Sequence, residues 1–326
     1  MSWTFYGVHA KPSEYVPIGR RWLVQHNGGC CRKRAVAFAK EAVYYAPLRR
    51  WQRRLHPANM CIGEIRATVQ RRWEGDNSEI PATIAYPITV PQMLLNVLDD
   101  DKRIIFYIFG YLQYPEDLNV QLMMEALCYG RTDNVVLLDW SKYSKGSYSV
   151  AFRNAEKIGN LFAQSIQLLV DSGLDVSRIY IVAHSLGAHI AGFVGKCNVF
   201  KIPRITALDP ANPLFYLPGC YLTRNDAEWV DVIHTDKGGY GTPTSMGTAD
   251  YYVNGGTRPQ PGCHFIGLPL SDIDLCSHQK SVVLYAKLKR HSTKFIAKEC
   301  SSYFSHIFNS CNKTRNIEVG YTAKNM

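Results

Sequence analysis

Hydrophobic residues follow two alternating patterns from about residue 103 onward. Short hydrophobic runs predict buried strands over Arg103–Gly110, Asn134–Trp140, Arg178–Ala183, Arg204–Leu208 and Trp229–Thr235. Longer stretches with hydrophobic residues at helical spacing predict helices over Leu118–Tyr129, Val150–Ser172, Ala188–Lys196 and near His278–Lys289. Short strands separated by such helices predict a mostly parallel central sheet with helices on both faces, the α/β class.

Two regions lack this periodicity. Residues 1–75 show no clean period, and the chain after Asp236 is rich in glycine until the last predicted helix. Long irregular stretches of this kind are usually functional loops or disordered segments. We therefore expect a poorly defined N-terminal extension over residues 1–75 and a single α/β domain over residues 76–326.

The formal charge of +10 lies in the N-terminal quarter. Residues 1–75 contain 14 Lys and Arg against 4 Asp and Glu, a difference of +10, whereas residues 76–326 contain 23 of each sign. A solvated extension accounts for this segment, and binding to an anionic partner such as a phospholipid surface is the alternative. Because no zinc-finger or RNA-binding motif accompanies the charge, we expect no nucleic-acid partner.

The 10 cysteines favour an oxidising compartment. None shows the paired C-x-x-C spacing with histidines that a zinc site requires, so we expect no metal of that kind. The last six, from Cys197 onward, favour local disulfides, and Asn312-Lys313-Thr314 is a glycosylation sequon. No run of about 18 apolar residues predicts a transmembrane helix. Met1–Lys11 shows no basic-then-apolar leader, which conflicts with secretion.

A serine motif follows the third predicted strand. Ala183-His184-Ser185-Leu186-Gly187 has the form A-x-S-x-G, with small residues two positions either side of the serine. A strand that turns sharply at a serine and enters a helix is how an α/β-hydrolase presents its nucleophile, and the turn tolerates only small flanking side chains. Alanine replaces the usual first glycine here.

A serine nucleophile needs a base and an acid, which follow it in the chain in this fold class. Asp209 ends the next predicted strand and precedes Pro210, at the edge where parallel sheets place their sites. The later histidines are His234, His264, His278, His291 and His306. A disulfide at Cys276 would fix the loop that carries His278, whereas His234 lies within a strand and His264 in a loop that we expect to be mobile. The choice of His278 rests mainly on the family resemblance described below.

The oxyanion of such a reaction needs two backbone N–H donors. One belongs to the residue after the nucleophile, Leu186. The other should come from the loop after the first central strand, where Tyr111 follows Phe109-Gly110, and its side chain would also form a wall of the acyl pocket. This chemistry needs no cofactor.

The stretch from about Arg103 to Lys289 resembles the animal pancreatic-lipase-like family, which includes lipases, phospholipases A1 and insect yolk proteins. The matching segments are Ala183–His189, Ile205–Ala211, Asp226–Asp236, Asn254–Gly256, Pro261–Cys263 and Cys276–His278. The resemblance implies the α/β-hydrolase fold and a catalytic triad of Ser185, Asp209 and His278. It also implies a Cys263–Cys276 disulfide that closes a lid loop, and it supports Cys300–Cys311. Cys197 with Cys220 is a further candidate pair.

The departures from the family pattern are also informative. Phe109 replaces the histidine of the family's His-Gly-aromatic oxyanion motif, which puts the alignment of the oxyanion donors in question. Asp226 matches a calcium ligand of the family but Thr223 replaces a carboxylate, so we expect no strong calcium site. Twelve residues separate Cys263 from Cys276, and the loop from Lys237 to Met246 is also short. Such short loops resemble those of the family's phospholipases A1.

The sequence therefore predicts a secreted serine ester hydrolase that acts on lipids at a membrane or lipid-droplet interface. The most specific prediction is a phospholipase A1, which hydrolyses the sn-1 acyl ester. The chain's end at Met326 predicts that no β-sandwich domain follows. The alternatives are a triglyceride lipase and a non-catalytic, yolk-protein-like lipid-binding protein. Positional selectivity, oligomeric state, protein partners and the pairing of Cys30, Cys31, Cys61 and Cys128 stay open.

Overall fold

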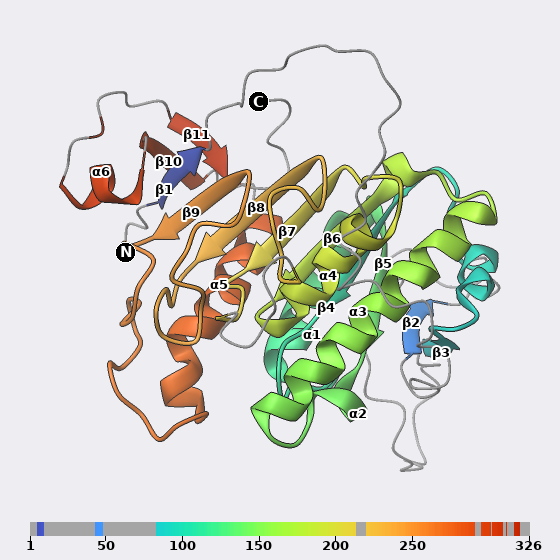
Figure 1. The fold of residues 1–326 in the computed structure, drawn as a ribbon, viewed down its shortest axis with the longest axis horizontal. Helices are drawn as coiled ribbons and strands as arrows, with labels where there is room; N and C mark the ends of the chain where they lie inside the picture. The colour runs from blue at the N-terminus through green and yellow to red at the C-terminus, as the bar shows by residue number, and fades with distance from the viewer. Residues whose placement is uncertain are drawn as a thin grey trace, which may run out of the picture.

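The computed structural model describes residues 5–9, 43–47, 83–212, 220–290, 295–300, 302–308, 311 and 316–319. Their strands form one sheet in the order β11-β10-β1-β9-β8-β7-β6-β4-β5-β2-β3 (Figure 1). The strands are β1 (Phe5–His9), β2 (Val43–Pro47), β3 (Thr83–Pro87), β4 (Arg103–Ile108), β5 (Asp133–Asp139), β6 (Ile179–His184), β7 (Arg204–Leu208), β8 (Trp229–His234), β9 (Ala249–Val253), β10 (Phe295–Cys300) and β11 (Asn316–Val319).

The centre of the sheet is parallel. Strands β5, β4, β6, β7, β8 and β9 pair in parallel in that order. All residues of β6 and β9 are buried, as expected for strands covered on both faces. Each fully buried Val or Ile contributes roughly 1.5–3 kcal/mol relative to an exposed one, so the hydrophobic runs fix these strands at the centre.

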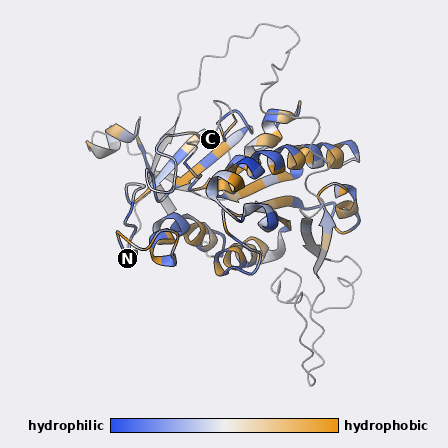
Figure 2. Ribbon diagram, turned by 60° about the horizontal axis from the view of Figure 1, so that its bottom comes forward, coloured by the Kyte–Doolittle hydropathy of each residue, from blue (hydrophilic) through white to orange (hydrophobic). Residues whose placement is uncertain are grey.

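Helices cover both faces of this sheet. The α-helices are α1 (Leu118–Cys128), α2 (Ser141–Ser144), α3 (Tyr148–Asp171), α4 (Leu186–Cys197), α5 (Asp272–Arg290) and α6 (Tyr303–Ile307). Short 3-10 helices span Pro91–Asn96, Tyr129–Arg131 and Val176–Arg178. Helices α3 and α4 pack together on one face and α1 and α5 on the other, with their hydrophobic sides toward the strands (Figures 1 and 2). This architecture is the α/β-hydrolase fold, as predicted.

The predicted strands and helices of residues 103–235 agree with the structure to within two residues at every end. The expectation of an irregular stretch from Asp236 to the last helix was wrong in part, because β9 lies within it. Its hydrophobic core is Tyr251-Tyr252-Val253, too short a run to distinguish from loop.

Two further strands come from residues 1–75. β1 pairs with β9 and β10, and β2 pairs with β3 and β5. The remainder of this segment, with all its lysines and arginines and with Cys30, Cys31 and Cys61, lies outside the described residues. The domain boundary at residue 75 and the role of the basic segment therefore stay predictions.

Helix α5 begins six residues earlier than predicted. Its first turn carries Asp272 and Asp274, and the Asp274 N–H donates to Ser271 Oγ (3.3 Å), a typical helix start. His278 therefore lies in a helix, and the expectation that a loop carries it was wrong. In the described part of the chain, no helix is long and apolar enough to span a bilayer.

His189 of α4 joins this helix to the segments that follow β7. Its ring is fully buried, and its Nε2–H donates to the Ala211 carbonyl (2.8 Å). Its Nδ1 accepts the Leu222 N–H (3.2 Å), so the imidazole must be neutral. Burial is the main cause that lowers the pKa of His189 to about 4.

This buried histidine predicts acid sensitivity. Its pKa in the unfolded chain is near 6.5, so between pH 6.5 and 4 the unfolded state binds a proton that the folded state does not. The free energy of unfolding should therefore fall as the pH decreases through this window, by up to about 1.4 kcal/mol per pH unit for one such group. Urea denaturation between pH 7 and 4 measures the slope. His189→Gln keeps a donor and an acceptor without titrating, and an unchanged slope in this variant would contradict the assignment.

Candidate active site

Ser185 lies at a strained turn between β6 and α4. Its backbone has φ 54° and ψ −122°, a conformation that non-glycine residues rarely adopt. The turn is held by the Ser185 N–H, which donates to the Leu208 carbonyl (3.0 Å). Gly187 permits close packing, because a Cβ there would lie 2.5 Å from the carbonyl oxygens of Ile108 and Phe109. The backbone at the end of β4 therefore leaves no space for a side chain at position 187.

Asp209 follows β7 and is fully buried. Its Oδ1 accepts the backbone N–H groups of Thr235 (2.9 Å) and Asp236 (3.1 Å), which follow β8. Gly241 packs against the same carboxylate, since a Cβ there would approach both oxygens to 2.7 Å. These contacts fix the carboxylate and leave Oδ2 facing the histidine.

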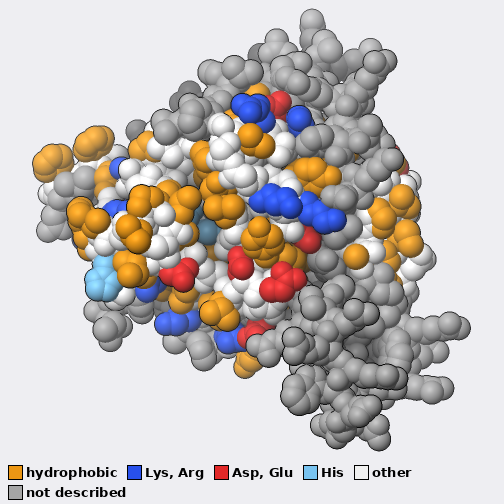
Figure 3. All heavy atoms as spheres, turned by 90° about the horizontal axis from the view of Figure 1, so that it is seen from below, with side chains coloured by type: hydrophobic (Ala, Val, Ile, Leu, Met, Phe, Trp, Pro, Cys, Tyr) orange, Lys and Arg blue, Asp and Glu red, His pale blue; other side chains and the backbone are white. Residues whose placement is uncertain are grey.

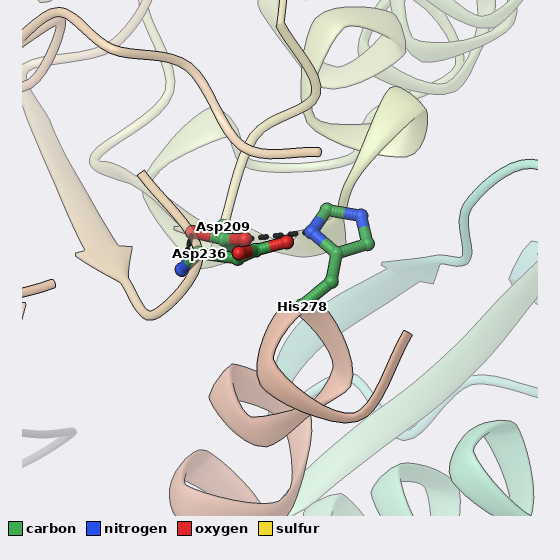
Figure 4. A group of neighbouring side chains, drawn as sticks. All are labelled: Asp209, Asp236 and His278. Carbon is green, nitrogen blue, oxygen red and sulfur yellow. Dashed lines mark hydrogen bonds and ion pairs between the residues drawn. The ribbon is translucent and has the colours of Figure 1, made fainter. Parts of the chain in front are cut away.

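His278 connects the acid to the serine. Its Nδ1 lies 2.6 Å from Asp209 Oδ2, a contact drawn in Figure 4. Its Nε2 lies 2.8 Å from Ser185 Oγ. A buried carboxylate can only accept, so Nδ1 carries the proton and Nε2 can accept from the serine hydroxyl. The structure thus brings the three predicted residues into one hydrogen-bonded line.

The other candidate histidines lie elsewhere. His234 is fully buried, stacks on Tyr252 and bonds Asp250 through Nε2 (2.7 Å). His264 is exposed in the loop between Cys263 and Cys276. The side chains of His291 and His306 lie outside the described residues.

The two predicted oxyanion donors flank the serine. Leu186 is the first residue of α4, where backbone N–H groups have no intrahelical partner. Tyr111 follows β4, and within the described part of the chain its N–H makes no hydrogen bond. Its ring packs edge-on against Tyr148 (5.2 Å between centroids), and both line the cavity beside Ser185.

A cavity of about 780 Å³ opens at the serine. Its polar lining includes His184, Asp117 and Asp272, and Leu112, Leu118, Leu270 and Leu275 contribute apolar surface. Leu118 is 86% exposed, and Ile266 and Leu268 of the neighbouring loop are 78% and 80% exposed. Figure 3 shows hydrophobic side chains gathered around acidic ones on the face seen from below. Such a surface fits an amphiphilic substrate better than a fully polar one.

The Cys263–Cys276 and Cys300–Cys311 disulfides are present as expected, and the first of them tethers this region. Cys263 is bonded to Cys276 of α5, which fixes the intervening loop to the helix that carries His278. Cys300 is bonded to Cys311. Cys197 and Cys220 are each disulfide-bonded, and their pairing with one another stays a prediction. Cys128 is buried.

Arg258 is a member of the site that sequence reasoning missed. Its guanidinium bonds both oxygens of the buried Asp236 (2.7 and 2.6 Å) and Asp274 Oδ1 (3.0 Å). Asp274 also accepts from the Tyr240 hydroxyl and from the Leu270 N–H. Arg258 therefore connects the segment beside Asp209 to the start of α5. No local sequence signal indicates this role, because the partners are distant in the chain.

Asp209, Asp236 and His278 lie close enough together to hold a metal ion (Figure 4). Their atoms are already paired, however. Both Asp236 oxygens accept from Arg258, and both Asp209 oxygens accept from backbone N–H groups or from His278. The cluster is therefore explained by its hydrogen bonds without a cation.

The residues at the family's calcium position do not fit a divalent cation. Asp226 is buried, and Lys196 of α4 places its ammonium directly on the Asp226 carboxylate. The same carboxylate oxygen accepts the Thr223 N–H (2.7 Å). An ammonium in this position supplies the positive charge that a bound cation would otherwise provide.

Replacing Lys196 should therefore destabilise the protein, whereas removing metal ions with a chelator should have no effect on its stability. Lys196→Met leaves the Asp226 carboxylate buried without its counter-ion, at a cost of about 3 kcal/mol in unfolding free energy. Lys201→Met, at an exposed position, is the matched control, and Lys196→Met with Asp226→Asn should recover much of the loss. Thermal denaturation with and without EDTA measures both effects. A lowered melting temperature of the wild-type protein on chelation would contradict the assignment.

Comparison with known proteins identifies the family of this chain. The family model described as Lipase matches residues 92–326. The chain is 40% identical over 184 residues to lipase member H-B of Xenopus laevis, covering 55% of this chain and 39% of that protein. It is 33% identical over 231 residues to pancreatic triacylglycerol lipase of Myocastor coypus, covering 65% and 50%. The chain thus spans half or less of the length of these relatives.

Among solved structures, α/β hydrolase domain-containing protein 10 from mouse aligns with a TM-score of 0.25 at 17% identity, covering 35% of this chain and 44% of that chain. Est1E from Butyrivibrio proteoclasticus aligns at 0.24 and 16%, covering 34% and 42%. Scores this low add nothing to the fold assignment, which rests on the sheet topology. The family match covers most of the chain and includes every residue of the Ser185 site, and the chain therefore belongs to the lipase family.

Proposed function

We propose that this protein is a serine carboxylic-ester hydrolase of lipids. The observation that carries the proposal is the hydrogen-bonded line from Asp209 through His278 to Ser185, at 2.6 and 2.8 Å, beside an open cavity. Ser185 is the nucleophile, His278 the general base and acid, and Asp209 the residue that orients His278.

The reaction proceeds in two steps, formation of an acyl-enzyme and its hydrolysis. Ser185 Oγ attacks the ester carbonyl carbon while its proton passes to His278 Nε2, and the carbonyl oxygen becomes an oxyanion held by the Leu186 and Tyr111 N–H groups. When the ester bond breaks, His278 returns the proton to the leaving alcohol. Water then attacks the acyl-enzyme, giving its proton to His278, which passes it to Ser185 as the fatty acid leaves.

The surroundings of His278 favour the transient positive charge on its ring. Asp209 lies against Nδ1, and the neighbouring His184 ring is 4.8 Å away between centroids. Burial, and secondarily the proximity of His278, hold the pKa of His184 well below its usual value. Because His184 stays neutral, it does not oppose protonation of His278.

A phospholipid, cleaved at its sn-1 acyl ester, is the substrate that we favour. The loop closed by Cys263–Cys276 spans a sequence separation of only 13, and this short rim leaves space beside Ser185 for a polar headgroup. The acidic side chains of Asp117 and Asp272 at the cavity suit a zwitterionic headgroup. One relative is named for triacylglycerol, so a triglyceride lipase is the second candidate. The assembled triad argues against a non-catalytic lipid-binding protein.

We further propose that the enzyme works at a membrane or lipid-droplet surface after secretion. The exposed side chains of Phe265, Ile266 and Leu268 beside the cavity would contact the lipid surface. Disulfides at Cys263–Cys276 and Cys300–Cys311 suit an oxidising compartment. The mechanism uses only the residues of this chain and needs no cofactor.

Ser185→Ala should abolish ester hydrolysis, with a loss of kcat of at least about 10³-fold, because no other group supplies the nucleophile. Asp209→Asn should lose about 10⁴-fold, because the histidine tautomer is no longer fixed. Hydrolysis of p-nitrophenyl butyrate measures both without a lipid interface. Ser172→Ala, at an exposed position, is the control. Full activity in Ser185→Ala would refute the proposed nucleophile.

A phosphatidylcholine labelled separately at its two acyl chains should release the sn-1 label first and in excess. Triolein presented in matched mixed micelles should be hydrolysed more slowly. Triolein has a third acyl chain in place of the polar headgroup, and the short loop closed by Cys263–Cys276 offers little surface to cover that chain. Chromatographic separation of the released fatty acids measures each rate. Faster hydrolysis of triolein would support the triglyceride lipase, and equal release of both labels would contradict sn-1 selectivity.

A further inference from the structure

Phe109 occupies the position at which the family's oxyanion motif has a histidine, and it cannot take over a polar role. Its side chain is fully buried and stacks on Trp140, with 6.4 Å between ring centroids and 22° between planes. Its carbonyl accepts the Trp140 Nε1–H (2.9 Å). The side chain therefore belongs to the core, and any polar group that fixes the oxyanion loop must come from another residue.

Gln113 supplies such a group from within the same loop. Its side chain is 7% exposed, and its Oε1 accepts the Gly110 N–H at 2.7 Å. The same oxygen lies 3.0 Å from Nδ1 of His184, the residue before the nucleophile. The Gln113 side-chain oxygen thus connects both ends of the Gly110–Gln113 loop to His184, the last residue of β6.

The protonation of His184 is consistent with this arrangement. The Gly110 N–H can only donate, so the Gln113 atom that faces it is the oxygen and not the amide nitrogen. His184 must then donate through Nδ1–H, which leaves Nε2 unprotonated. The contact between His184 Nε2 and the His278 carbonyl, at 3.4 Å, is correspondingly long. The Gln113 oxygen therefore accepts from the Gly110 N–H and from the Nδ1–H of a neutral His184 imidazole.

The Gly110–Gln113 turn lies directly against the nucleophile and is strained. A Cβ at Gly110 would come within 2.8 Å of Ser185 Cβ, and Leu112 adopts φ 55°. A non-glycine residue in this region costs of order 1–3 kcal/mol and persists only where its surroundings hold it. The Tyr111 hydroxyl, which donates to the Gly146 carbonyl (2.5 Å), anchors the outer side of the loop. Gln113 anchors its inner side.

We propose that Gln113, oriented by His184, is the positioning residue that aligns the Tyr111 N–H as an oxyanion donor in place of the missing histidine. By binding the Gly110 N–H, Gln113 fixes the Phe109–Gly110 peptide, which adjoins the peptide that carries the Tyr111 N–H. The Tyr111 N–H, which has no partner in the described part of the chain, is then held beside Ser185 together with the Leu186 N–H. This inference rests on the proposed ester hydrolase function.

The test compares four variants on p-nitrophenyl butyrate. Gln113→Met keeps the size of the side chain and removes the acceptor, and Gln113→Asn keeps an amide that cannot reach Gly110. Both should lower kcat about 10- to 100-fold with little change in KM, because the lost alignment matters only in the transition state. Gln113→Glu retains an acceptor oxygen and should keep kcat within about 10-fold of the wild type. Gln167→Met, on the surface of α3, should behave as the wild type.

A boronic acid that forms a tetrahedral adduct with Ser185 gives a second readout. Its inhibition constant should rise in Gln113→Met by about the factor by which kcat falls, because its oxygen occupies the oxyanion position. If Gln113→Met does not fold, as judged by circular dichroism, the Asn and Glu variants decide the question. A kcat within twofold of the wild type in the Asn or Met variant, while Ser185→Ala is inactive, would overturn the role of Gln113 alone. An inactive wild-type protein would overturn the proposed function and this inference together.

Discussion

The close approach of helix α4 to the end of strand β4 is the constraint on which the site depends. Gly187 lies where no side chain would fit beside the carbonyls of Ile108 and Phe109. This packing forces the sharp turn at Ser185 and brings the first N–H of α4 beside the loop after β4. The proposed nucleophile and the proposed oxyanion donors are consequently fixed by one backbone contact between two buried elements.

His278, the proposed base, reaches this point from the other side of the sheet. His278 is held on α5, whose start is joined to the loop after Cys263 by a disulfide and to Asp236 through Arg258. Since Asp236 also donates its N–H to Asp209, the acid and the base share one network of fixed groups. A rigid network of this kind costs little reorganisation when charge develops during a reaction.

Buried charges in the structure are balanced from within the chain. Arg258 neutralises Asp236, and Lys196 neutralises Asp226. His184 and His189 stay neutral instead, since the pKa of each is lowered mainly by burial. Each of these solutions avoids an isolated buried charge, which would be far more costly than a paired or neutral group.

The sequence by itself predicted where the central strands and helices lie along the chain and singled out the serine motif. The family resemblance added Asp209 and His278 as candidate site residues, and the structure brings them together with Ser185. Periodicity and short motifs indicate local structure only. A family match adds residues that are distant in the chain, because the family's motifs occur in a fixed order. Strands β1 and β2, the early start of α5 at Asp272, and the contacts of Arg258, Lys196 and Gln113 were decided only by tertiary structure. Their partners are remote in the chain, or lie in a strained turn, and neither arrangement leaves a periodic or compositional signal.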